Sequence, residues 1–344
     1  MSDPRTAWRE EIPAGEEALH EALAQRLRAM AEARDRGSAR RILHLKPHVG
    51  VEARFVVRDD VPEELRVGLF AKAGTHRALV RFSNGGTARQ ADAKPDVRGI
   101  ALKIFGVPGK KLIPGLEDAE TQDFLMILAS AVPFRDAQEF VTLVTAAASP
   151  ATALFKLIGG LGFSRTFQVL GALRKGMSEI VPSLATATYH TALPLRFGPF
   201  AAKLRLAPTT TEAGPVDPSP SRYREDLARR IAKGPLAWEL SAQLYSDATT
   251  TPIEDPTVEW QGPFVPLARL EIPQQDVATA AGAKLEAAVE AMSFDPWHAL
   301  VEHRPLGGMM RARNAAYRVS TQARAATSEA SVADGVPWVL DPPA

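Results

Sequence analysis

The 344-residue sequence contains no cysteine. This absence excludes disulfides, iron–sulfur clusters, zinc sites with cysteine ligands and cysteine nucleophiles. The charges nearly balance, with 41 basic and 40 acidic side chains, so nucleic acid is not expected as a partner. The length is sufficient for one large domain or two ordinary ones, and the hydrophobic content of 45% supports a buried core.

Long uninterrupted hydrophobic runs are also absent. Residues 1–36 are rich in charge and show no apolar segment typical of a signal peptide, so we expect a cytoplasmic protein. The most apolar stretch, at 152–173, is interrupted by Lys156 and Arg165 and is too polar for a membrane span. The helical insert that contains it, at about 137–183, has three open roles: lining a substrate entrance, docking a partner, or touching a membrane surface through about 152–175.

Short β-rich segments alternate with helical ones along most of the chain. This pattern predicts an α+β protein, an antiparallel β-barrel of about eight strands with inserted and appended α-helices. The predicted organisation is an N-terminal helical arm, the barrel with its helical insert, a C-terminal helix and an irregular tail, at 1–37, 38–290, 291–330 and 331–344.

The last long helix carries a candidate metal-binding stripe. Arg313 precedes Tyr317 by one helical turn and Arg324 follows it by about two, so the three side chains are expected on one face. A guanidinium beside a phenol favours the phenolate, which is an anionic ligand for ferric haem iron. Taken alone, the pattern is also that of an ordinary arginine–tyrosine surface pair.

Three further segments precede this helix in order. They are RILHLK at 41–46, VRFS at 80–83 followed by DVRGIALKIF at 96–105, and the run from Asp123 to Phe140. Together with the C-terminal helix they resemble the haem catalase family in order and spacing over about residues 38–326. The length of the chain resembles the short, catalase-related branch of that family, the mini-catalases.

The resemblance implies one haem b per chain, with Tyr317 as the axial iron ligand and Arg313 stabilising its phenolate. Arg41, Arg81 and Arg324 would pair with the haem propionates or lie near the phenolate. Arginine suits carboxylates because its planar fork can donate two parallel hydrogen bonds.

On the peroxide side, the resemblance assigns His44 to shuttle a proton between the two oxygens of a peroxide, with Ser83 orienting its imidazole. Phe140 would pack on the porphyrin. Leu128 aligns where the family has an asparagine that donates to the peroxide, and leucine cannot donate. Gly85 aligns with a valine over the haem, so we expect a wider and more apolar pocket than in catalases.

These departures favour a catalase-like haem peroxidase that reduces organic hydroperoxides, with weak or absent hydrogen peroxide dismutation. Two alternatives stay open. One is a hydroperoxide isomerase or dehydratase that resembles allene oxide synthases and acts on lipid hydroperoxides, and the other is a non-catalytic haem- or lipid-binding barrel. The expected partners are an organic or lipid hydroperoxide, an electron donor that the sequence does not identify, and further copies of the chain in a homo-oligomer.

Overall fold

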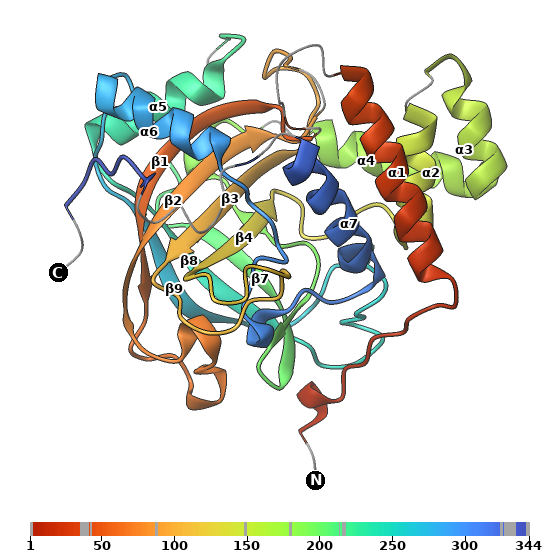
Figure 1. Ribbon diagram of the computed structural model, residues 1–344, viewed down its shortest axis with the longest axis horizontal. Coiled ribbons are helices and arrows are strands. Elements are labelled where there is room, and N and C mark those ends of the chain that lie inside the picture. The colour runs from red at the N-terminus through yellow and green to blue at the C-terminus, as the bar shows by residue number, and fades with distance from the viewer. Residues whose placement is uncertain are drawn as a thin grey trace.

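The computed structural model describes residues 3–34, 41, 43–86, 89–147, 150–178, 181–212, 214, 218–323, 326 and 335–341. Its strands form one antiparallel sheet in the order β5-β4-β3-β2-β1-β9-β8-β7-β6, and a further pairing of β5 with β7 closes an eight-stranded barrel (Figure 1). The strands are β1 Lys46–Val57, β2 Gly74–Asn84, β3 Arg98–Phe105, β4 Thr121–Ile127, β5 Tyr189–His190, β6 Leu195–Phe197, β7 Phe200–Pro208, β8 Leu236–Leu244 and β9 Phe264–Ile272.

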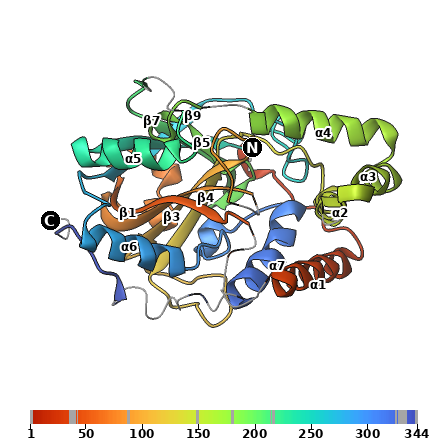
Figure 2. The ribbon, with the colours of Figure 1, turned by 90° about the horizontal axis from the view of Figure 1, so that it is seen from above.

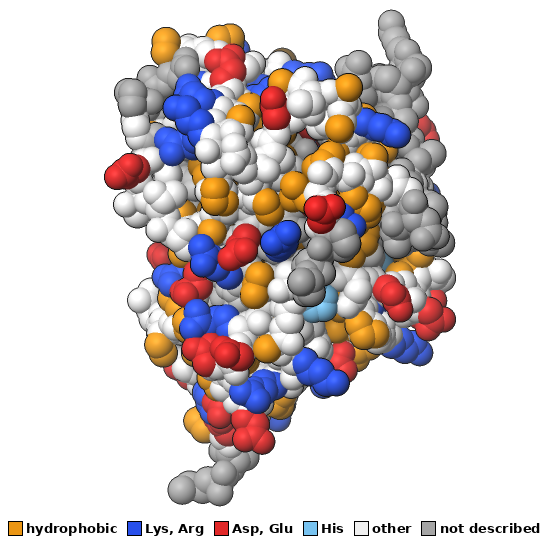
Figure 3. Space-filling view, turned by 90° about the vertical axis from the view of Figure 1, so that its left-hand side faces the viewer, with side chains coloured by type: hydrophobic (Ala, Val, Ile, Leu, Met, Phe, Trp, Pro, Cys, Tyr) orange, Lys and Arg blue, Asp and Glu red, His pale blue; other side chains and the backbone are white. Residues whose placement is uncertain are grey.

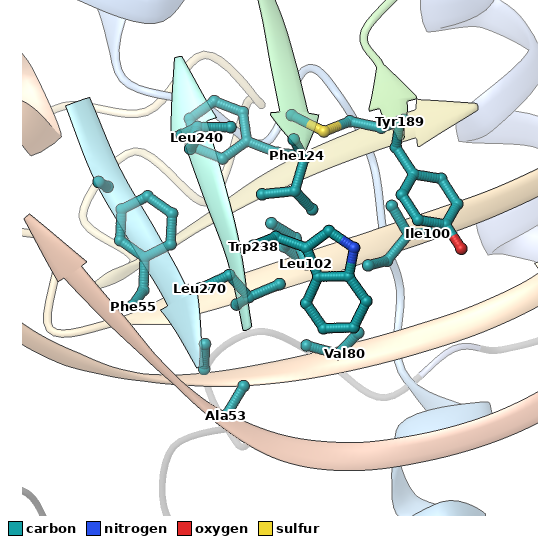
Figure 4. Packing of buried hydrophobic residues seen from close by; sticks show 14 of the residues in the cluster. Ala53, Phe55, Val80, Ile100, Leu102, Phe124, Tyr189, Trp238, Leu240 and Leu270 are labelled. Carbon is teal, nitrogen blue, oxygen red and sulfur yellow. The ribbon is translucent and has the colours of Figure 1, made fainter. Parts of the chain in front are cut away.

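The barrel interior is filled by every second residue of its strands, because successive side chains of a strand point to opposite faces. Figure 4 shows this packing, with the fully buried Trp238 at its centre and its indole nitrogen donating to the Ala187 carbonyl. Full burial of each large apolar side chain contributes about 1.5–3 kcal/mol. The same alternation turns Leu79, Arg81 and Ser83 of β2 to the outer face of the barrel, where the helices pack.

The helices lie in two groups on opposite sides of the barrel (Figures 1 and 2). One group consists of α5 Arg222–Lys233 and α6 Ala280–Ala291. The other group consists of α1 Glu16–Arg34, α2 Ala137–Ala147, α3 Ala153–Leu161, α4 Phe163–Ser178 and α7 Gly308–Ala323. Short 3-10 helices occupy Pro4–Thr6, Glu63–Leu65, Gly68–Phe70, Pro150–Thr152, Leu184–Thr186 and Val301–His303.

The prediction of an α+β antiparallel barrel with inserted and appended helices is confirmed. The apolar stretch at 152–173 is a helical hairpin, α3 and α4, that turns at Gly162, whose φ of 79° favours glycine. Between α4 and β6 the chain has only the two strand residues of β5, because a 3-10 helix takes up Leu184–Thr186. No helix within the described ranges is long and apolar enough to span a bilayer.

Helix α7 is held between the barrel and α1. Leu23 and Leu27 of α1 pack with Ala312 and Val319 of α7 in one buried cluster. Figures 1 and 2 both show α1 running beside α7. Residues of the C-terminal helix face the outer side of β2, β3 and β4, since all four elements line one pocket.

Candidate active site

A largely apolar pocket lies between this outer face and α7. Of the residues selected from the sequence, those that line it are Arg41, His44, Arg81, Ser83, Phe140, Arg313 and Tyr317. They come from the chain before β1, from β2, from α2 and from α7, so the fold joins segments that are far apart in the sequence. Arg324 lies outside the described residues.

His44 is held against the sheet by its side chain and its backbone. Its ring nitrogen Nδ1 is 2.9 Å from Ser83 Oγ, and Arg81 donates to its carbonyl oxygen at 2.8 Å. The residue has a φ of 55°, a left-handed conformation that costs a non-glycine residue about 1–2 kcal/mol. The ring rests on Gly99 of β3, where an added Cβ would lie 3.0 Å from His44 Cε1. The imidazole position is therefore determined by three neighbours.

The surroundings of His44 also set its charge. Burial, and then the positive charges of Arg81, Arg313 and Arg41, lower the pKa of His44 to about 3. The imidazole is therefore neutral at neutral pH. In the tautomer in which Nδ1 donates to Ser83 Oγ, Nε2 carries the lone pair and can accept a proton in the pocket.

Tyr317 brings a phenol to the same pocket from α7. Arg313, one turn earlier, donates to its hydroxyl oxygen at 3.0 Å, and the guanidinium carbon lies 5.4 Å from the ring centroid. The pocket thus contains an imidazole on the sheet side and an arginine-paired phenol on the helix side.

Two arginines at the edge of the pocket share one carboxylate. Glu290 of α6 accepts from Arg81 Nε at 2.8 Å and lies 3.5 Å from Arg41 Nε. Arg41 also donates to the Met292 carbonyl at 2.7 Å. Two guanidinium groups gathered around a carboxylate form the donor set that a propionate would require. The sequence analysis did not identify Glu290, and only its position in space relates it to the pocket.

Leu128 is not in the place expected for it. Along β4, Phe124 and Met126 belong to the barrel core, and Leu128 packs against the same core. Leu125 and Ile127 are the alternate residues and line the pocket, to which Met126 also contributes. Strand alternation therefore gives the pocket position to Ile127, which like leucine has no hydrogen-bond donor in its side chain.

The role expected for Gly85 also needs correction. Gly85 is not among the described residues that line the pocket. Its carbonyl accepts a hydrogen bond from the His44 backbone at 3.0 Å, and an added Cβ would lie 2.9 Å from Val97 Cβ. This glycine permits close backbone packing behind His44, and the pocket is not widened there.

Apart from the hydroxyl side chains of Thr191, Ser320 and Thr321, apolar side chains form most of the remaining walls of the pocket. Phe140 of α2 packs edge-on against Phe134, with ring centroids 5.6 Å apart. Val132, Leu193 and Met309 complete this wall, which is suited to a large flat apolar group or to an oily substrate.

The closed barrel with α7 packed on its outer face defines a catalase-like fold. A fungal catalase superposes with a TM-score of 0.65 at 18% identity over 90% of this chain and 63% of its own. A bacterial catalase gives 0.62 at 17% over 90% and 61%, and catalase A from Saccharomyces cerevisiae gives 0.64 at 15% over 90% and 66%. This chain therefore spans less than two thirds of the length of these catalases. No protein-family model and no curated protein sequence matches it.

Proposed function

We propose that the pocket binds haem b and that the protein is a catalase-like haem peroxidase that reduces organic hydroperoxides. The observation that carries this proposal is that His44 and the arginine-paired Tyr317 line the same apolar pocket. The catalase-like fold supports it. Tyr317 would bind the iron, and Arg41 and Arg81 would release Glu290 and bind the propionates. Bound ferric haem would supply the electron-transfer chemistry for cleaving the peroxide O–O bond.

The chain itself supplies proton transfer. Neutral His44 would accept the hydroperoxide proton at Nε2 and then deliver it to the departing oxygen. Ser83 would hold Nδ1 and so keep Nε2 facing the peroxide. The complete reaction converts a hydroperoxide into an alcohol and water and consumes two electrons and two protons. An external reductant must therefore supply the electrons.

The apolar pocket favours organic hydroperoxides over hydrogen peroxide. Neither asparagine nor glutamine is among the described residues that line it, and Ile127 stands on the pocket face of β4. Loss of one preorganised donor costs about 10²–10³-fold in rate in enzymes that use such a donor. We therefore expect slow oxygen release from hydrogen peroxide.

The function is tested by loading the purified protein with haem and supplying cumene hydroperoxide, with and without a one-electron donor dye. We expect repeated conversion to the alcohol, beyond one equivalent per haem, only with the donor. Repeated consumption without a donor would instead indicate an isomerase or dehydratase. Rapid oxygen release from hydrogen peroxide would contradict the expectation that the apolar pocket disfavours this substrate. Failure of the protein to take up haem would overturn the whole proposal.

His44→Gln should lower the hydroperoxide reaction rate by about 10²–10⁴-fold, because it removes the proton acceptor. The haem absorption spectrum should remain that of the unsubstituted protein. Because protonation of the imidazole blocks its role, the wild-type rate should fall only as the pH approaches the low pKa of His44, about 3. His76→Gln is the control, since His76 bonds the Phe105 carbonyl on β3 and lies away from the pocket. Equal rates in both variants would show that His44 is not the proton acceptor.

Gly99→Ala should lower the rate by about tenfold by displacing the imidazole while haem uptake persists. The added methyl group would lie 3.0 Å from His44 Cε1 and 3.1 Å from the Met126 carbonyl oxygen, so the ring must move. Gly74→Ala is the matched control, because it lies on β2 and a Cβ there meets nothing within 4 Å. Initial rates with cumene hydroperoxide measure the effect, and a Gly99→Ala rate equal to that of Gly74→Ala would show that this contact does not position His44.

A further inference from the structure

The hairpin of α3 and α4 exposes large apolar side chains to solvent. Phe155 is 78% exposed, Phe163 68%, Phe167 49% and Leu154 45%. Every exposed phenylalanine of the described chain lies on this hairpin. Phe163 and Phe167 pack together with ring centroids 4.9 Å apart, so they form one continuous patch. Side chains of this size at such exposure indicate a contact surface.

The charges of the hairpin are of one sign. Residues 150–178 include Lys156, Arg165, Arg174 and Lys175 and contain no aspartate or glutamate. Lys156 and Arg174 are exposed, whereas Arg165 is paired with Glu139 of α2 at 2.6 Å. The opposite side of the molecule differs, because acidic and basic side chains are interspersed there (Figure 3). Exposed aromatic and basic side chains on a segment that has no acidic residue of its own are typical of helices that lie in the headgroup region of anionic membranes.

The inner face of the hairpin is packed on the wall of the pocket. Leu161 and Val169 share one apolar cluster with Phe134 and Leu193, which line the pocket. The hairpin is also fixed to α2, since an added Cβ at Gly160 would lie 2.6 Å from Thr142 Cγ2. The exposed patch is thus the outer side of an anchored element, and Figures 1 and 2 show α3 at the outer edge of its helix group.

We propose that the outer face of the α3–α4 hairpin docks on anionic lipid bilayers and that oxidised acyl chains are the substrate class of the adjacent pocket. Phe155 and Phe163 would enter the headgroup region, while Lys156 and Arg174 would meet the lipid phosphates. The second part of this inference rests on the proposed function of the pocket. The docking itself does not depend on haem.

The docking is tested by flotation of the full-length protein with vesicles. We expect binding to phosphatidylcholine vesicles that contain phosphatidylglycerol, and weaker binding to phosphatidylcholine alone or at high salt. The double variant Phe155→Ser/Phe163→Ser should lose at least about tenfold in partition. Ile12→Ser is the matched control, because Ile12 is 70% exposed but lies before α1. Lys156→Glu should weaken binding, whereas Lys72→Glu, at an exposed lysine elsewhere, should not.

Equal partition of the double variant and the wild type would overturn the docking. A second result would also overturn it: the wild type is an oligomer that does not bind vesicles, and the double variant dissociates. The hairpin face would then join two copies of this chain. The substrate part is tested with hydroperoxides of phospholipids in vesicles and with water-soluble tert-butyl hydroperoxide. We expect the double variant to react more slowly than the wild type with the phospholipid hydroperoxides alone. Equal losses of rate with the two substrates would contradict the assignment of oxidised acyl chains. If neither substrate is consumed but vesicle binding follows the pattern above, the proposed function fails while the docking stands.

Discussion

Replacing Tyr317 with phenylalanine is expected to abolish stable haem binding and to leave the fold intact. The substitution keeps the ring that packs in the pocket but removes the phenol oxygen that Arg313 contacts at 3.0 Å. Loss of partners that only orient a metal ligand already weakens metal binding by about 10–100-fold, so loss of the ligand itself should exceed about 100-fold. Titration of the protein with haem, followed by absorbance, measures the dissociation constant.

Two further variants separate loss of the ligand from general damage. Tyr317→His should restore haem binding with a different absorption spectrum, because imidazole is also an axial ligand of haem iron. Tyr189→Phe should bind haem like the wild type, since this tyrosine is buried in the barrel and donates to the Leu184 carbonyl. A Tyr317→Phe protein with the wild-type spectrum would show that another residue is the ligand.

The architecture could be predicted because it depends on repeated local signals. Alternating β-rich segments and the helices between them predicted the closed barrel, and the structure confirms it. The one-turn spacing of Arg313 and Tyr317 was sufficient to place them together on α7, because helix geometry relates residues at that distance.

Single positions at the ends of strands could not be predicted in the same way. A shift of one residue moves a side chain from one face of a sheet to the other. Leu128 was therefore expected in a pocket that is lined by Ile127. Gly85 was interpreted as an enlargement of the pocket, although its contact with Val97 depends on how the chain approaches β3.

Contacts between distant segments leave no local signal at all. Glu290 lies 209 residues after Arg81, and nothing in its own segment indicates that it joins two arginines at the pocket. The role of Gly99 could not be predicted from the sequence either, because its contact with His44 arises only when β3 pairs with β2. Residues of this kind are identified by the structure and not by spacing in the sequence.

Lys103→Met is expected to lower the free energy of unfolding by about 3–5 kcal/mol, because it leaves a buried carboxylate without its cation. Lys103 Nζ lies 2.8 Å from Asp123 Oδ1, and both side chains are fully buried. The other oxygen of Asp123 accepts from the backbone nitrogen of Asp295 at 2.9 Å. The pair therefore fastens the segment before α7 to the outer face of the barrel.

Urea denaturation measures this loss, and a surface pair provides the comparison. Arg58→Met breaks a pair with Asp60 in which the side chains are 38% and 61% exposed, and should cost no more than about 1 kcal/mol. Lys103→Met/Asp123→Leu should regain part of the loss because both charges of the pair are removed together, but not all of it, since the backbone N–H of Asp295 loses its acceptor. Haem affinity should also fall in Lys103→Met, because the Lys103–Asp123 pair holds the segment before α7 against the barrel. A stability loss no larger than that of Arg58→Met would show that the buried pair does not hold α7 on the barrel.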